Sequence, residues 1–252
     1  MNFYYKFDII EIEQTIGALP MIKRERYMQQ IRPFIDKDLI KVMTGIRRGG
    51  KSVMLDLIKE ELLGRGVLPE QIISYNFEKL SLEPLTTAVA LHEDVMQKAK
   101  GIPGKVYLFF DEIQEVTDWQ KACKTLRLHN TSVFITGSNS KILSKEFTKE
   151  FSGRYVSFRI RPFVYKEMLN YSKETGNNYT ITDYLIWGGF PKLLEFSSKE
   201  DRLIYLNDIY SSIVNNDLIV RFNIKNTELF KKITNYILRS NARIFSSRSI
   251  ES

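Results

Sequence analysis

A short glycine-rich segment constrains the fold more than any other feature of this chain. It follows an apolar run, precedes a helical pattern, and reads Gly45-Ile46-Arg47-Arg48-Gly49-Gly50-Lys51-Ser52. The segment fits G-x-x-x-x-G-K-[ST], a phosphate-binding loop that joins a strand to a helix. Inward-pointing N–H groups of such a loop surround the phosphates, and the helix that follows presents its positive dipole end to the same anion.

Two side chains of this loop have roles of their own. Lys51 supplies a cation that can reach the β- and γ-phosphates of a nucleotide, and the Ser52 hydroxyl can ligate a magnesium ion. We expect the nucleotide to contact the whole loop and the first turn of the helix. The residues expected there are Gly45, Ile46, Arg47, Arg48, Gly49, Gly50, Lys51, Ser52 and Val53.

Apolar runs alternate with helical patterns on both sides of the loop. Strands are expected at residues 39–43, 72–77, 106–110, 132–136 and 155–160, and helices within 21–34 and at 51–63, 84–99 and 119–128. Such alternation predicts an α/β fold with a five-stranded parallel sheet covered by helices on both faces. Ligands of such sheets bind at the carboxyl ends of the strands, which is where the glycine loop lies.

An acidic pair, Asp111-Glu112, follows the third apolar run. An aspartate at the tip of a buried strand can hold the magnesium ion opposite Ser52. The adjacent glutamate can orient or deprotonate an attacking water molecule. A solvated acidic loop is the plainer interpretation, and the glycine loop upstream favours the catalytic one.

Polar residues also follow the fourth and precede the fifth expected strand. Ser138 or Asn139 could sense the γ-phosphate, although Ser138 could instead cap a helix. Arg154 could act on the nucleotide of a neighbouring subunit, sense it in its own subunit, or lie on the surface. Arginine suits the first two roles because its planar guanidinium matches phosphate oxygens.

Several functional classes are disfavoured. The sequence lacks Asp-x-x-Gly and Asn-Lys-x-Asp after the third expected strand, which argues against a guanine nucleotide. It also lacks an arginine-rich lid that interrupts the sheet, which argues against a small-molecule kinase. Two histidines and the single Cys123 argue against a zinc site. No apolar run is long enough to span a membrane, and we expect neither a signal peptide nor a location outside the cytoplasm.

The formal net charge is +7 and 43% of the residues are hydrophobic, which is compatible with a folded core and an anionic partner such as nucleic acid. After residue 162 the pattern changes to helices, expected at 163–174, 180–187, 199–214 and 227–239. Within them Gly188-Gly189-Phe190-Pro191 is typical of a sharp turn that ends a helix.

The motifs together resemble a prokaryotic family of AAA-type ATPases whose members carry a further C-terminal domain of unknown function. The similarity covers about residues 21–225. The segments that carry it are 41–52, Phe110-Asp111-Glu112-Ile113-Gln114, 135–140, Ser152-Gly153-Arg154-Tyr155, Arg161-Pro162-Phe163 and 188–191. Gly49 departs from it, since a small aliphatic residue often stands there.

The resemblance implies ATP or ADP with Mg²⁺, a P-loop sheet in the order 5-1-4-3-2, a helical lid and then a winged helix. It places Arg24 and Tyr27, in the entry segment, near the adenine. The expected domains are 1–162 (with the entry segment 1–36), 163–225, and a winged-helix start at 226–252. We expect the winged-helix domain to be incomplete and the family's C-terminal domain to be missing.

The leading hypothesis is a magnesium-dependent ATPase that couples hydrolysis to movement of the helical region. Its expected catalytic residues are Lys51, Glu112, Ser138, Asn139 and Arg154, and its metal ligands Ser52 and Asp111. The alternative is a nucleotide-gated module that binds DNA or a protein with little turnover. A small-molecule phosphotransferase is a third and weaker hypothesis. An oligomer is possible, and no membrane partner is expected.

Overall fold

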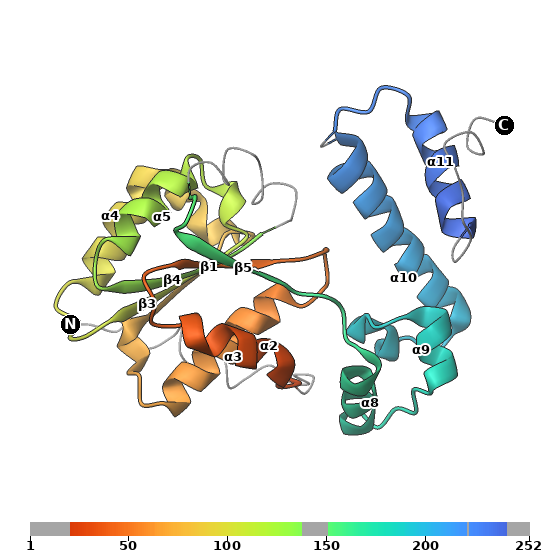
Figure 1. The fold of residues 1–252 in the computed structure, drawn as a ribbon, viewed down its shortest axis with the longest axis horizontal. Coiled ribbons are helices and arrows are strands. Elements are labelled where there is room, and N and C mark those ends of the chain that lie inside the picture. The colour runs from red at the N-terminus through yellow and green to blue at the C-terminus, as the bar shows by residue number, and fades with distance from the viewer. Residues whose placement is uncertain (1–20, 138–150, 221, 241–252) are drawn as a thin grey trace.

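The computed structural model describes residues 21–137, 151–220 and 222–240. A sheet with helices on both faces forms one part, and a smaller group of helices forms the other (Figure 1). The chain passes from the first part to the second directly after strand β5. This arrangement agrees with the predicted change of pattern near residue 162, although the exact domain limits stay a prediction.

The sheet has five parallel strands. They are β1 (Ile40–Thr44), β2 (Ile72–Asn76), β3 (Val106–Asp111), β4 (Thr131–Thr136) and β5 (Tyr155–Arg159). Their order is β2-β3-β4-β1-β5, which is the predicted order 5-1-4-3-2 counted from the other edge. Strand β1 therefore lies between β4 and the edge strand β5, and the segment that follows it reaches the carboxyl edge of the sheet.

Helices cover both faces of this sheet. In Figure 1, α4 (Ala88–Ala99) and α5 (Trp119–Arg127) lie above it, and α2 (Glu25–Ile31) and α3 (Lys51–Gly64) lie below it. Neighbouring strand residues alternate between the two cores, because successive side chains of a strand point to opposite faces. Leu108 and Phe110 face α4 and α5, whereas Phe109 faces α3. Burial on both faces explains the apolar runs.

Several element boundaries differ from the sequence predictions. Residues Leu80–Leu85 form a 3₁₀ segment, and α4 starts at Ala88 instead of residue 84. Thr87 is extended because it bridges to Thr117, and its hydroxyl accepts a hydrogen bond from the Ala90 N–H at 3.3 Å. The N-terminal helix is also shorter than its apolar pattern, since α2 gives way to the 3₁₀ turn Arg32–Phe34 at Pro33.

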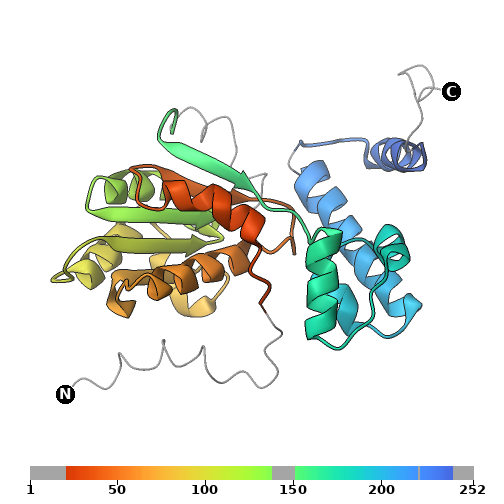
Figure 2. The same ribbon diagram turned by 60° about the horizontal axis from the view of Figure 1, so that its bottom comes forward.

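The helical part has its own core. It contains α8 (Tyr165–Glu174), α9 (Ile181–Trp187), the 3₁₀ turn Pro191–Glu195, α10 (Lys199–Ser212), the π-helical segment Ile213–Val220 and α11 (Thr227–Arg239). Met168, Tyr179 and Leu193 are buried there, and Ile22 joins them from the N-terminal segment. Figure 2 shows α8 beside the end of the sheet and α11 at a distance from it.

Of the predicted winged helix, the structure describes α11 alone, because residues 241–252 lie outside the described residues. The winged helix therefore stays a prediction. Within the described ranges, none of the helices combines the length and apolar character needed to cross a membrane.

Candidate functional site

The glycine loop turns sharply from β1 into α3. Gly45 has a φ of +154°, and a Cβ there would lie 2.1 Å from the Ile160 carbonyl oxygen, so any side chain would clash with the backbone after β5. Gly50, directly before α3, has a φ of +91°, a conformation that glycine adopts readily. These two glycines let the loop fold back over the N-terminus of α3, where an anion is favoured.

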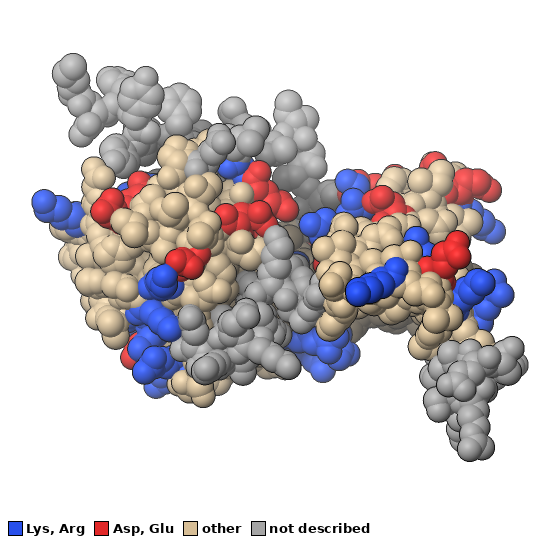
Figure 3. All heavy atoms as spheres, turned by 90° about the horizontal axis from the view of Figure 1, so that it is seen from above, with Lys and Arg blue, Asp and Glu red and all other residues tan. Residues whose placement is uncertain are grey.

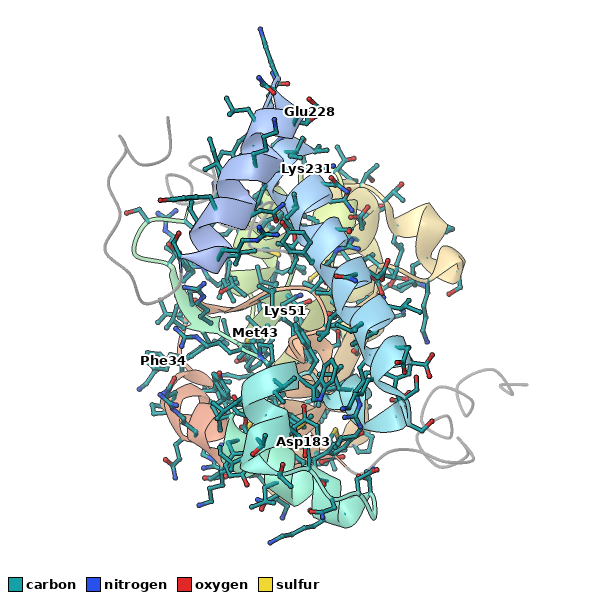
Figure 4. The ribbon with its side chains drawn as sticks, turned by 90° about the vertical axis from the view of Figure 1, so that its right-hand side faces the viewer. Phe34, Met43, Lys51, Asp183, Glu228 and Lys231 are labelled. Carbon is teal, nitrogen blue, oxygen red and sulfur yellow. The ribbon has the colours of Figure 1, made fainter. Side chains whose placement is uncertain are left out.

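A cleft of about 880 Å³ separates this loop from the helical part. The loop side contributes Arg47, Arg48, Gly50, Lys51, Ser52 and Val53. The helical side contributes Tyr171, Lys192, Tyr205 and Asp208 among others, and Glu112 lines the cleft from the end of β3. In Figure 4, which looks at the molecule from the helical part, Lys51 lies near the centre of the view. The cleft is large enough for a nucleotide.

Lys51 and Glu112 meet in this cleft. The ammonium nitrogen of Lys51 lies 3.8 Å from Oε1 of Glu112 and 3.4 Å from the Ile46 carbonyl oxygen. Glu112 has a left-handed backbone (φ 52°), and Nε2 of Gln114 donates a hydrogen bond to its Oε2. The turn aims the carboxylate at the space in front of the loop, as a water-activating residue requires.

Asp111 and Ser52 offer the oxygen ligands that Mg²⁺ prefers. Asp111 is buried and accepts a hydrogen bond from the Thr136 hydroxyl through Oδ1, whereas Ser52 is exposed at the start of α3. The described residues contain no group of three or more His, Cys, Asp or Glu side chains that could form a complete cage. This set fits Mg²⁺, which is usually held by one or two protein oxygens together with phosphates and water.

The helical part also touches the loop directly. The Arg48 guanidinium lies 3.4 Å from Oδ2 of Asp208 and 4.9 Å from the centre of the Tyr205 ring, both on α10. Burial raises the pKa of Tyr205, and the charge of Arg48 partly offsets this effect. Because Arg48 and Asp208 are largely exposed, their pairing is weak and can open when a ligand enters the cleft.

Comparison with known families agrees with this geometry. A family model described as an AAA domain matches residues 37–169, more than half of the chain. The chain belongs to the AAA domain family. A second model, described as a domain of unknown function, matches residues 178–252. That match covers most of the region predicted as the lid and the start of a winged helix.

Two curated relatives are described only as uncharacterized proteins. An uncharacterized protein of Haemophilus influenzae is 37% identical over 219 residues, which cover 84% of this chain and 54% of that protein. An uncharacterized protein of Methanocaldococcus jannaschii is 29% identical over 222 residues, covering 84% of this chain and 49% of its own length. The chain thus spans about half the length of these relatives.

A solved structure with a similar fold is the Walker-type ATPase PABY2304 of Pyrococcus abyssi. It superposes with a TM-score of 0.53 at 13% identity and covers 92% of this chain and 87% of its own. At that identity the likeness shows a shared P-loop fold. It does not extend to the reaction or to the site residues.

Not every predicted site residue lies at the cleft of this AAA domain. Arg154 is exposed at the start of β5, and its carbonyl accepts a hydrogen bond from the N–H of Ile40, the first residue of β1. The glycine loop follows the opposite end of β1, roughly 16 Å away for five residues at about 3.3 Å each. A sensing role in the same subunit is therefore corrected, and a role towards a neighbouring subunit stays a prediction.

The prediction for Arg24 also needs a correction. The Arg24 side chain is buried, packs under the loop, and donates to the Gly49 carbonyl oxygen, so it has no open face towards the cleft. Tyr27 lies beneath the same guanidinium, and its hydroxyl accepts a hydrogen bond from the Arg161 N–H. Direct contact of Arg24 with adenine does not fit this burial, whereas Tyr27 is half-buried and its contact with adenine stays a prediction. Ser138 and Asn139 lie outside the described residues, so their sensing role stays a prediction.

Thr136 is a site residue that the sequence did not single out. Its hydroxyl donates to Asp111 and accepts from the Glu112 N–H at 3.0 Å, so it holds both members of the acidic pair. A threonine at the end of β4, the strand beside β3, was the available signal. Gln114, Tyr205 and Asp208 were also missed as site residues, because their contacts depend on backbone turns and on distant helices.

Proposed function

We propose that this AAA domain is a magnesium-dependent ATPase. The observation that carries the proposal is the Glu112 carboxylate beside Lys51, at the mouth of a glycine loop and in a cleft of nucleotide size. Loop amides and Lys51 would hold the phosphates of ATP, and ADP would occupy the same place. Ser52 and Asp111 would hold Mg²⁺, which neutralises charge on the phosphate oxygens.

Glu112 would orient the attacking water molecule and accept its proton. The proposed mechanism consists of positioning and electrostatic stabilisation, as is usual for phosphoryl transfer. Ser138 or Asn139 would sense the γ-phosphate, and Arg154 would act only on a neighbouring subunit. Movement of the helical part would accompany turnover, because its residues Tyr205 and Asp208 meet the loop residue Arg48 across the cleft.

Hydrolysis by two variants tests the proposed roles. We expect Glu112→Gln to bind ATP normally and to release phosphate at least about 100-fold more slowly, because general-base catalysis contributes this much or more. Lys51→Ala should lose ATP affinity, because a cation at the phosphates is removed. Glu70→Gln, at an exposed glutamate outside the cleft, is the matched control and should behave as the wild type.

A normal turnover rate for Glu112→Gln would rule out its role with water. ADP formation that requires an added acceptor, with the phosphoryl group recovered on that acceptor, would instead support the phosphotransferase hypothesis.

The second candidate, a nucleotide-gated binding module, is favoured by α11. This helix has no buried residue and carries Lys231, Lys232 and Arg239. Figure 4 places Lys231 and Glu228 far from Lys51. Lys and Arg residues are interspersed with Asp and Glu on the face seen in Figure 3, which gives no uniformly basic surface there. ATP-dependent, salt-sensitive retention on DNA with negligible phosphate release would favour this module.

A further inference from the structure

Arg24 is the buried charged residue that best connects the parts of this molecule. Its side chain is 0% exposed, and it lies just before α2 with a left-handed backbone (φ 34°). The guanidinium packs on the Tyr27 ring at 4.6 Å and the Phe163 ring at 5.2 Å. Such complete burial of an arginine requires several hydrogen bonds, since an unpaired charge in the interior is costly.

One of these hydrogen bonds fixes the phosphate loop. Nη1 of Arg24 donates to the Gly49 carbonyl oxygen at 3.2 Å. The Gly49 carbonyl and the Gly50 N–H belong to one planar trans peptide, so they point in opposite directions. Gly49 is buried, whereas Gly50 lines the cleft. Holding the carbonyl towards Arg24 therefore turns the Gly50 N–H towards the space where the phosphates would bind.

The other hydrogen bonds fix the connection to the helical part. Nη2 donates to the Arg161 carbonyl oxygen at 2.7 Å, in the segment that leads from β5 to α8. Nε and Nη2 donate to the two carboxylate oxygens of Glu167, each at 3.2 Å. Glu167 in turn accepts the Val164 N–H at 3.0 Å and so caps α8. One side chain thus joins the loop, the connecting segment and the first helix beyond it.

We propose that Arg24 is a positioning residue for phosphate binding: it orients the Gly50 amide from behind the loop and ties that orientation to the connecting segment and to α8. The proposal rests on the proposed nucleotide site, and it replaces the adenine contact that the resemblance implied. A residue that acts through the loop backbone affects every ligand with phosphates. A residue at the base affects only ligands that contain adenine.

The two roles separate in a binding experiment with ADP and with inorganic tripolyphosphate, each titrated calorimetrically into the same protein. For Arg24→Met we expect both affinities to fall by a similar factor of about ten, the size of one lost charge-assisted hydrogen bond. Arg24→Lys keeps the charge but cannot reach all three partners at once, so it should lose part of both affinities. Thermal unfolding identifies the variants that remain folded.

Arg32→Met is the matched control. Arg32 is an ion-paired arginine of the same N-terminal segment, but its partners are Glu25 and Glu61. Its loss should leave both affinities unchanged. If Arg24→Met does not fold, Arg24→Lys decides the question in the same two titrations.

Other results of these titrations would contradict either the positioning role of Arg24 or the proposed nucleotide site. Unchanged affinity for tripolyphosphate in the folded Arg24 variants would overturn the positioning role, and a loss confined to ADP would restore the adenine contact. If the expected loss occurs but the wild type does not hydrolyse ATP, the ATPase proposal fails and the role of Arg24 stands. A wild type that binds neither ligand would overturn both.

Discussion

At the scale of single residues, the site depends on side chains that never touch the cleft surface. The Thr136 hydroxyl is fully buried, donates to Asp111, and accepts from the Glu112 backbone. It therefore sets the carboxylate proposed for Mg²⁺ and the turn that presents the proposed base. Removing a buried hydroxyl with two such hydrogen bonds is costly for stability, because it leaves two partners unsatisfied.

Thr136→Val keeps the shape of the side chain and removes both hydrogen bonds. We expect the free energy of unfolding to fall by about 1–3 kcal/mol. We also expect the Mg²⁺ concentration for half-maximal hydrolysis to rise severalfold, because Asp111 loses the donor that orients it. A magnesium titration of phosphate release measures this change. Thr125→Val is the control, since that hydroxyl donates only to a main-chain oxygen on α5.

The sequence could predict the residues whose roles follow from local spacing. Gly45 to Ser52 form the expected loop, and Asp111-Glu112 end a buried strand as expected. Arg24 could not be placed in this way, because its partners Gly49, Arg161 and Glu167 lie up to 143 positions along the chain. The position of Arg154 could have been predicted, because it precedes a strand of a parallel sheet whose ligands bind at the opposite ends of the strands.

At the scale of elements, periodicity predicted the strands well and the helix starts less well. Both ends of each of the five strands lie within one residue of the expected limits, because burial on both faces makes each strand an apolar run. The start of α4 was missed because a bridge between Thr87 and Thr117 keeps Thr87 extended. Such a contact between distant residues has no signal in the local pattern. The strand order came from the resemblance.

The turn between α9 and the following 3₁₀ helix is another element that depends on backbone contact. A Cβ on Gly189 would lie 1.9 Å from the Phe163 carbonyl oxygen, and the Phe163 N–H donates to the Gly189 carbonyl oxygen at 2.8 Å. This pairing supports the structural interpretation of the glycine pair. It also holds the helical part against its own connecting segment.

Gly189→Ala should therefore destabilise the helical part by about 1–3 kcal/mol, the usual cost of overpacking. Limited proteolysis should show earlier cleavage after residue 163 than in the wild type. Gly64→Ala is the control, because the space around Gly64 is open and its helical backbone accepts alanine. Equal stability of the two variants would show that the turn can relax without cost.

At the scale of the whole molecule, two sets of contacts among the described residues join the parts on either side of the cleft. Arg24 joins them behind the loop, and Arg48 with Asp208 and Tyr205 joins them in front of it. The rear connection, made by Arg24, is buried, and the front connection, made by Arg48 and Asp208, is largely exposed. A ligand that enters the cleft would therefore disturb the front contact first and rotate the helical part about the rear one, as a hinge does.

Fluorescence energy transfer between the two parts measures this rotation. Glu70→Cys and Glu200→Cys place exposed labelling sites on the sheet part and on α10. The native Cys123 is fully buried and burial raises the pKa of its thiol, so it should stay unlabelled.

In a Glu112→Gln background we expect magnesium-ATP to change the transfer efficiency. Lys51→Ala should abolish the change, and Arg48→Ala should shift the starting value. Constant transfer at saturating ATP would mean that the helical part does not respond to the nucleotide.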